Sequence, residues 1–223
     1  MVSVLPVSAL AQVSPDPLLA SQIVDRYAEH IFYASGATGM ALVAIDGNQR
    51  VFTSFGETRP GNNIRPQQDS LIRIASLSKL MTSEVMVKMA ERGQIRLDDP
   101  LSRYAPPGAR VPAHNGQPIR LINLATHTGS LPREQPGGKP HRPVFVWPTK
   151  SDRWQWLGNA TLKAAPGTQA AYSNLGFDLL ADALAKAGGT PYPALLQRLV
   201  TRPLGMKDTT FTPSPDQCQR LMV

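Results

Sequence analysis

Residues 76–93, which read SLSKLMTSEVMVKMAERG, form the stretch of sequence that most strongly predicts a fold element. Apolar side chains recur there every three to four positions, which is the period of an amphipathic helix. We expect the helix to run from Ser76 to Arg92 and to end at Gly93, because glycine commonly follows the last helical turn. The side chains that we expect on its buried side are Leu77, Leu80, Met81, Val85 and Met89.

The first residues of this helix carry a possible catalytic pair, Ser76 and Lys79, in an S-x-x-K arrangement. A spacing of three places the two side chains on one helix face, with Cβ atoms about 5–6 Å apart. The unpaired N–H groups and positive dipole end of a helix start suit the stabilisation of an oxyanion. A serine hydroxyl needs a base to become a nucleophile, and a desolvated lysine of lowered pKa can serve. Alone, this motif is weak, because chance gives about 0.5 matches in such a chain.

A second motif, Tyr172-Ser173-Asn174, follows the turn residues 166–168 and directly precedes another expected helix. On such a tight loop its side chains can converge on a cleft. Tyr172 can relay protons, and the amide of Asn174 can hold a substrate carbonyl and orient Lys79. The alternative is that Ser173 or Asn174 merely caps the helix.

The N-terminal part of the chain predicts an α+β arrangement. Residues Leu18–Ala34 have helical periodicity, and Gly39–Ile45 and Gln49–Phe55 have strand composition. Asp46-Gly47 supplies the turn of a hairpin between them. A loop rich in Pro, Asn and Gly follows at Pro60–Pro66. The apolar series of the first helix is Leu19, Ile23, Tyr27 and Ile31.

Further elements are expected toward the C-terminus. Ile119–Ala125 reads as a short apolar helix or turn, and Thr190–Val200 as a helix whose first two residues are its N-cap and N1 proline. Ser130–Thr149 carries five prolines without periodicity, which indicates a functional surface loop. Asn174–Ala187 predicts a helix whose inward side chains are Leu175, Leu179, Leu180, Ala183 and Leu184.

Composition excludes several classes of protein. The chain has 223 residues, 42% of them hydrophobic, so a globular core is feasible. Its net charge of +7 suits anionic partners, but the cations are scattered, which argues against nucleic-acid binding. Cys218 is the single cysteine, and the four histidines lack metal-ligand spacing, so we expect no disulfide framework, metal or cofactor. We interpret His127 as a structural loop residue. No apolar run is long enough to span a membrane.

The two ends of the sequence suggest a piece of an exported protein. Residues 1–11 are apolar or small and end in Ala9-Leu10-Ala11, which resembles the cleavage site of a secretory signal. We therefore interpret residues 1–11 as a remnant of a signal peptide and residues 12–223 as one incomplete domain. The segment after Thr201 reads as an internal connection rather than as an end.

Together the two motifs, in this order and each at a helix entrance, resemble those of the serine penicillin-recognising family. This family includes low-molecular-weight penicillin-binding proteins, D-alanyl-D-alanine carboxypeptidases and class C β-lactamases. Within it the chain is most similar to D-alanyl-D-alanine carboxypeptidase/endopeptidases, particularly through residues 56–66 and 133–148. The other matching segments are Leu97–Pro100, Leu124–Gly129, Pro166–Asn174 and Pro203–Met206 with Thr209 and Phe211.

The resemblance implies a three-layer αβα fold, with an antiparallel sheet, a helical subdomain and the C-terminal strands missing. The family also has a third motif, Lys-Thr-Gly or His-x-Gly, on a strand beside the nucleophile. His127-Thr128-Gly129 and Lys186-Ala187-Gly188 imitate it, but the first lies between the other two motifs and the second ends a helix. We reject both and expect the true motif beyond Val223.

The function implied by the resemblance is acyl transfer on peptidoglycan stem peptides in the periplasm. Ser76 would attack the D-Ala-D-Ala carbonyl, Lys79 and Tyr172 would move protons, and Asn174 would bind substrate. β-Lactams would be ligands as well, and peripheral membrane association and oligomeric state stay open. The alternatives are a class C-like β-lactamase or esterase of the same family, or an inactive truncated fragment.

Overall fold

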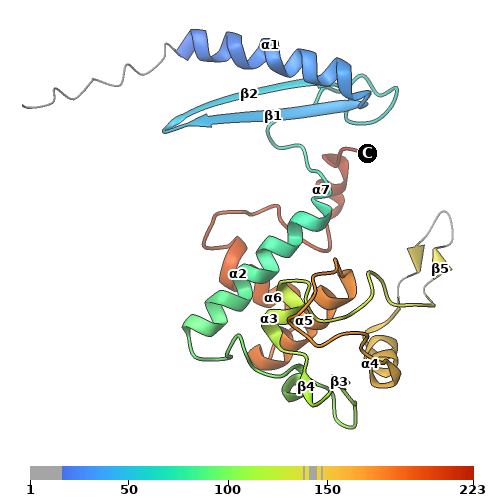
Figure 1. Cartoon of the computed structure of the whole chain (residues 1–223). Helices are drawn as coiled ribbons and strands as arrows, with labels where there is room; N and C mark the ends of the chain where they lie inside the picture. The colour runs from blue at the N-terminus through green and yellow to red at the C-terminus, as the bar shows by residue number, and fades with distance from the viewer. Residues whose placement is uncertain (1–16, 138, 141–144, 147) are drawn as a thin grey trace, which may run out of the picture. The chain divides into compact units, whose positions relative to one another are not determined.

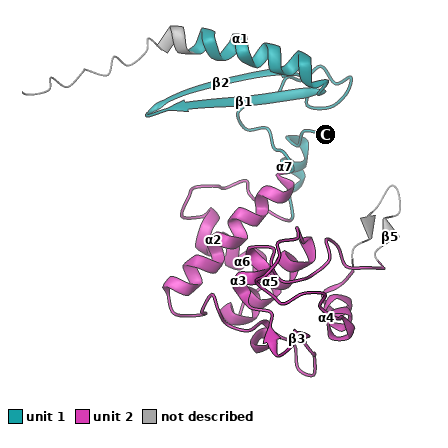
Figure 2. Ribbon diagram, viewed as in Figure 1, with its two compact units in different colours: residues 1–73, 212–223 teal, residues 74–211 magenta. Residues whose placement is uncertain are grey.

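The computed structural model describes residues 17–223 except 138, 141–144 and 147 (Figure 1). Its contacts divide the chain into two compact units, residues 1–73 with 212–223, and residues 74–211 (Figure 2). The expected signal remnant, residues 1–11, lies outside the described residues. All four candidate site residues belong to the second unit, so the candidate site lies within one unit.

The first unit contains a helix and an antiparallel hairpin. Helix α1 spans Pro17–Ser35, strand β1 spans Gly39–Asp46 and strand β2 spans Gln49–Gly56. The strands pair from Gly39 opposite Gly56 to Asp46 opposite Gln49. Gly47, with φ 57°, takes the left-handed conformation at the two-residue turn. The predicted order of helix, strand, turn and strand is confirmed.

Helix α1 packs against β2 (Figure 1), and the side chains at this contact are not those of its apolar series. The Phe32 and Phe55 rings stack with centroids 5.7 Å apart, and Ala28 is fully buried. Ile23, Tyr27 and Ile31, the described members of the predicted series, are exposed. The series therefore marks a helix correctly without identifying the face that contacts the sheet. The unit also includes α7, Pro215–Gln219, and a parallel bridge between residues 71 and 221.

The second unit is mainly helical, with very short antiparallel strand pairs. Those pairs are β3 (Ala113–His114) with β4 (Gln117–Pro118), and β5 (Lys139–Pro140) with β6 (Phe145–Val146). The helical segments are η1 (Ala75–Leu77), α2 (Ser78–Glu91), η2 (Leu101–Tyr104), α3 (Leu121–Ala125), α4 (Lys150–Asn159), α5 (Asn174–Gly188), α6 (Tyr192–Leu196) and η3 (Gln197–Thr201).

Helix α5 is the centre of this unit and contacts α2, α3, α6 and η2. The five inward side chains predicted for it are all buried. Its N-cap is Ser173, whose Oγ accepts a hydrogen bond from Gly176 N, and its C-cap is Gly189, with φ 61°. The expected cap of the next helix was wrong by one residue: α6 has Pro191, rather than Thr190, as its N-cap.

Helix α2 confirms the predicted core helix but corrects its buried face. Its 3-10 turn η1 precedes it, so the expected single helix begins as two segments. Val85 and Met89 are fully buried, but Leu77 is 59% and Leu80 70% exposed. The 3.6-residue period identifies a broad apolar face of the helix, but it does not say which part of that face is buried. The position of α5 decides which part is covered.

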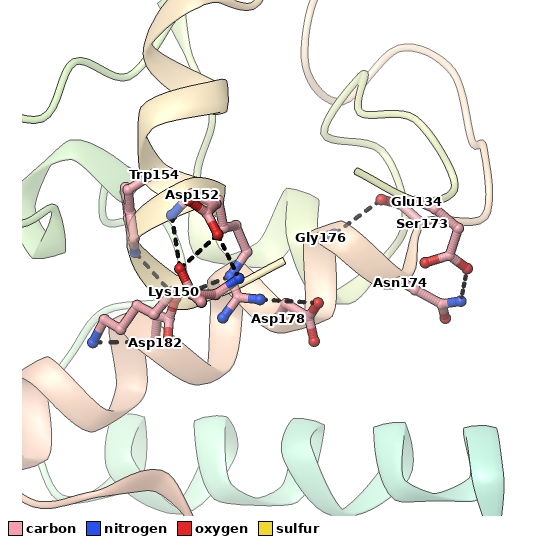
Figure 3. A network of polar contacts seen from close by, with 11 residues as sticks. Glu134, Lys150, Asp152, Trp154, Ser173, Asn174, Gly176, Asp178 and Asp182 are labelled. Atoms are coloured by element: carbon pink, nitrogen blue, oxygen red, sulfur yellow. Dashed lines mark hydrogen bonds and ion pairs between the residues drawn. The ribbon is translucent and has the colours of Figure 1, made fainter. Parts of the chain in front are cut away.

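Helix α4 was not predicted, and it lies within reach of α5 (Figure 3). Thr149 and Asp152 form a reciprocal capping box at its start. Arg153 donates to Asp178 and Asp182 of α5, in each case over 3.2 Å. The preceding span, residues 130–149, was expected to be structureless, but β5 and β6 pair within it.

These elements confirm the predicted α+β class. The antiparallel hairpin with its helix lies in one unit, and the mainly helical unit corresponds to the predicted helical subdomain. Within residues 17–223, apart from the six that are not described, no helix has the length and apolarity needed to cross a membrane.

Candidate active site

Ser76 lies in the short turn η1, directly before helix α2, and Lys79 lies in the first turn of α2. The turn is tight: Ala75 has φ 44°, and Ser78 Oγ donates to the Ala75 carbonyl over 2.8 Å. A positive φ is uncommon for alanine and needs support from surrounding contacts. Ser76 is exposed and Lys79 half-buried, so the serine hydroxyl is accessible beside a lysine with less solvent around it.

The structure brings Ser76, Lys79 and Tyr172 together. Ser76 Oγ lies 2.7 Å from the Tyr172 hydroxyl, and Lys79 Nζ donates to Ser76 Oγ over 3.4 Å. Lys79 Nζ also lies 5.0 Å from the centroid of the Tyr172 ring and 5.6 Å from that of Phe177. One hydroxyl thus has two proton-transferring groups within hydrogen-bond reach.

Positive charge around Tyr172 favours its phenolate. Hydrogen bonds with Lys79 and with Ser76 lower the pKa of Tyr172 below its ordinary value of 10, and the charges of Lys79 and Arg133 act in the same direction. The guanidinium carbon of Arg133 lies 4.9 Å from the centroid of the Tyr172 ring. A lowered phenol pKa makes proton acceptance from a neighbouring serine easier.

Asn174 lies near Ser76, Lys79 and Tyr172 because it follows Tyr172 by two residues, but its side-chain amide does not bond Lys79. Its Nδ2 donates a short hydrogen bond to Oε1 of Glu134, rather than to Lys79 as the sequence suggested (Figure 3). The capping role considered for this motif falls to Ser173, whose Oγ accepts from Gly176 N over 2.9 Å.

Three residues of the site were not identified from the sequence: His127, Arg133 and Glu134. His127 was singled out only as a structural loop histidine, yet its ring lies 4.5 Å from that of Tyr172. Arg133 and Glu134 lie on the loop 130–149, whose prolines indicated a functional loop and whose residues 133–148 carried part of the family resemblance, but neither residue was given a role. Their pairing with Tyr172 and Asn174 depends on tertiary packing, which no local pattern reports.

Charge and burial set the state of His127. Burial lowers its pKa, and the nearby charge of Lys79 lowers it further, so the imidazole is neutral at pH 7. Its Nδ1 accepts a hydrogen bond from Ser173 N over 3.0 Å, which places the ring proton on Nε2. Among the described residues, no group of three or more His, Cys, Asp or Glu side chains could hold a metal ion.

The structure thus brings together a serine at a helix entrance, a lysine one turn later and a tyrosine from a distant loop, as the two sequence motifs predicted. A protein-family model described as beta-lactamase matches residues 21–222, and the chain belongs to this family. The predicted family resemblance and fold are therefore confirmed.

Two curated relatives have names that describe an activity. The chain is 72% identical over 213 residues to the Escherichia coli K12 protein named D-alanyl-D-alanine-carboxypeptidase/endopeptidase AmpH, covering 96% of this chain and 55% of that protein. It is 29% identical to Esterase EstB of Burkholderia gladioli, over 77% of this chain and 46% of the relative.

A solved structure agrees with the fold. It is described as a beta-lactamase/D-alanine carboxypeptidase from Yersinia pestis in complex with citrate, and is 64% identical to this chain. The superposition has a TM-score of 0.88 and covers 93% of this chain and 60% of that one. The chain spans about half the length of the curated relatives that it matches.

Proposed function

We propose that this chain carries the nucleophile of an exported serine hydrolase that cleaves D-alanyl-D-alanine stem peptides of peptidoglycan, as carboxypeptidase and endopeptidase, through an acyl-enzyme on Ser76. The observation that carries the proposal is the position of Ser76 Oγ, 2.7 Å from the Tyr172 hydroxyl and 3.4 Å from Lys79 Nζ. The similarity to a protein named for this activity, at 72% identity, supports the choice of substrate.

In the proposed acylation, Ser76 Oγ attacks the carbonyl carbon of the penultimate D-alanine. The serine proton passes to the Tyr172 phenolate, which the lowered pKa of Tyr172 favours, and Lys79, whose Nζ lies 3.4 Å from Ser76 Oγ, assists this transfer. The peptide C–N bond then breaks, and the same proton goes to the leaving amine. Water attacks the ester carbonyl next, giving up a proton to the same base, which returns it to Ser76 as the ester bond breaks.

Asn174 is proposed to bind the substrate next to the reacting bond. Its amide nitrogen already donates to Glu134, so the amide is oriented before substrate arrives. The remaining hydrogen and the carbonyl oxygen of the amide can pair with a peptide group of the substrate. Pre-orientation of this kind lowers the entropy lost on binding.

The alternative within the same chemistry is a β-lactamase or an esterase. Relatives named beta-lactamase in Pseudomonas fluorescens and esterase in Burkholderia gladioli are 27% and 29% identical to the chain, and all three activities use an acyl-enzyme. A further alternative is that this length of chain is inactive by itself. These possibilities differ in what is turned over, so the assay below separates them.

The periplasm is the proposed location. The segment Ala9-Leu10-Ala11 supports export, and peptidoglycan lies outside the inner membrane. A net charge of +7 suits a wall polymer that is rich in carboxylates. The proposed ligands are peptidoglycan peptides and β-lactams.

A fluorescent penicillin tests the assignment of the nucleophile. The full chain should be labelled covalently, and mass spectrometry should place the adduct on Ser76. Ser76→Ala should abolish labelling, and Ser83→Ala, the same change further along α2, should leave it intact. Absence of labelling in the folded wild type, or equal labelling of Ser76→Ala, would overturn the proposal. Release of D-alanine from a pentapeptide, measured against hydrolysis of a chromogenic cephalosporin or ester, then distinguishes the alternatives.

A further inference from the structure

One residue, His127, holds the backbone on both sides of Tyr172. Its carbonyl oxygen accepts a hydrogen bond from Ala171 N over 2.8 Å, and its Nδ1 accepts one from Ser173 N over 3.0 Å. Its ring also lies against the Tyr172 ring, with centroids 4.5 Å apart and planes inclined by 31°. Backbone before Tyr172, backbone after it and its aromatic ring are therefore all fixed by the same residue.

The backbone of His127 is itself held in an uncommon conformation. It has φ 58°, at the point where the chain leaves helix α3, and such a left-handed residue is a common way to end a helix. The neighbouring Thr128 extends the hold: its N–H donates to Asn123 O, and its carbonyl accepts from Gly167 N, both over 2.8 Å. The left-handed turn directs both hydrogen-bond acceptors of His127 toward the Tyr172 loop.

We propose that His127 is a positioning residue for Tyr172, which holds the phenol hydroxyl within reach of Ser76. His127 touches none of the proposed reacting atoms, so it acts through Tyr172 rather than on substrate. The inference deepens the proposed function and rests on it only for the statement that Tyr172 is the group that moves a proton.

The chemistry of the imidazole fits this task. An acceptor at Nδ1 requires the neutral ring with its proton on Nε2. The charge that acts on this ring is that of Lys79 on α2, and Arg133 lies against the neighbouring Tyr172 ring. The ring of Phe177 of α5 also lies near the His127 ring, with centroids 5.2 Å apart. Protonation would put a hydrogen on Nδ1 opposite the Ser173 N–H, and the hold on the loop would be lost.

Two substitutions separate the hydrogen bond from the ring. His127→Ala removes both the acceptor and the aromatic contact. His127→Asn keeps a side-chain oxygen that can accept from Ser173 N, and asparagine tolerates the left-handed conformation better than most residues. His114→Asn is the matched control, because His114 Nδ1 lies 3.2 Å from a backbone carbonyl, that of Leu162, away from Tyr172.

The test is the pKa of Tyr172 itself, followed by NMR of ¹³Cζ-labelled tyrosine in the full chain and assigned with Tyr172→Phe. We expect His127→Ala to raise the pKa of Tyr172 toward its ordinary value, because the phenol moves away from Lys79 and Ser76. His127→Asn and His114→Asn should titrate like the wild type. A wild-type Tyr172 titration in folded His127→Ala would overturn the inference. If His127→Ala does not fold, His127→Gly takes its place, because glycine adopts the left-handed φ of 58° without strain and also lacks the acceptor and the ring. A wild-type Tyr172 titration in folded His127→Gly would overturn the inference in the same way.

Penicillin acylation provides the second readout. His127→Ala should slow acylation of Ser76 about 10- to 100-fold at saturating penicillin, with little change in the concentration needed for half-saturation, and His127→Asn should recover most of the rate. Equal rates in the wild type and His127→Ala would contradict the positioning role. The NMR titration needs no activity, so a failure of the proposed function (no acylation in any variant) is distinguished from a failure of this inference (no change at Tyr172).

Discussion

The hydroxyl of Tyr172 lies 2.7 Å from Oγ of Ser76, although 96 residues separate them in the chain. The two residues come from the entrances of two helices: Ser76 precedes α2, and Tyr172 precedes the N-cap of α5. Because α2 and α5 pack against each other in the core, their entrances bring the two hydroxyls together. The contact is thus a consequence of core packing, and it is what the proposed chemistry requires.

Removing the Tyr172 hydroxyl tests this relationship. Tyr172→Phe keeps the ring, and with it the contacts to Lys79 and His127, but removes the partner of Ser76 Oγ. We expect acylation of Ser76 by a fluorescent penicillin to slow by about 100-fold or more, because a positioned proton acceptor contributes about 10²–10⁴-fold. The rate is measured from the time course of covalent labelling.

A second tyrosine provides the control. Tyr192 also bonds a hydroxyl, that of Thr82, over 2.6 Å, but it belongs to α6. Tyr192→Phe should lower stability by about 1 kcal/mol and leave the labelling rate within about twofold. Equal labelling rates for the wild type and Tyr172→Phe would contradict a proton-transferring role for Tyr172.

Gly56 is expected to be essential for the end of the hairpin. It has φ 68°, and a Cβ there would lie 2.1 Å from the Thr38 carbonyl oxygen and 2.8 Å from the Phe32 ring. Gly56→Ala combines a left-handed penalty with a clash against backbone, so we expect a loss of about 2–4 kcal/mol in unfolding free energy. Gly61→Ala has φ 77° but open space, and should cost only about 1–2 kcal/mol. Denaturant unfolding compares the two, and equal losses would show that the clash is relieved.

The spacing of apolar residues predicted the buried face of a helix correctly where the whole apolar face is covered by other elements. The stripe of α5 is correct because that helix is surrounded by other elements, so its whole apolar arc is covered. On α2 the same reasoning misplaced Leu77 and Leu80, which are exposed, because only part of the arc meets α5. The residues of helix α4 are on average too polar to show the apolar periodicity of an amphipathic helix. The capping box at Thr149 was the available sequence signal for this helix.

The site shows the same division. Ser76 and Lys79 could be paired from the sequence because a spacing of three places both side chains on one helix face, and Lys79 Nζ lies 3.4 Å from Ser76 Oγ. Tyr172 could be added only through its motif and its position before a helix. The partner of Asn174 and the hold of His127 on the Tyr172 loop are long-range contacts between loops, which have no period to reveal them.

The carboxylate of Asp182 is expected to be the main anchor of α4 on α5 (Figure 3). Asp182 Oδ2 accepts from Trp154 Nε1 over 3.0 Å and from Arg153 Nε over 3.2 Å, and its side chain is only 14% exposed. Asp182→Ala leaves an indole N–H and most of a guanidinium buried without this partner. We expect a loss of about 2–3 kcal/mol in unfolding free energy, measured by thermal or denaturant unfolding.

Asp178 is the matched control for this junction. It bonds the same arginine over 3.2 Å, but its side chain is 58% exposed. Water can replace the lost contact, so Asp178→Ala should cost less than about 1 kcal/mol. Similar losses for the two variants would contradict the view that burial gives Asp182 its larger effect.

Alkaline pH should weaken the fold through Tyr104. Burial, together with its hydrogen bond to Asp99, raises the pKa of Tyr104 to about 12. The unfolded chain releases this proton near pH 10 and the folded chain only near pH 12, so the stabilisation is complete below pH 10 and is lost as the pH rises to 12. A pKa difference of this size corresponds to about 2–3 kcal/mol.

Tyr104→Phe tests this assignment, because phenylalanine has neither the hydrogen bond to Asp99 nor a proton to lose. The variant should be less stable than the wild type at pH 7.5, and this difference in unfolding free energy should narrow by about 1 kcal/mol by pH 11. Urea unfolding of both proteins across this range measures the gap, and a gap that stays constant from pH 7.5 to 11 would contradict the assignment of the proton to Tyr104.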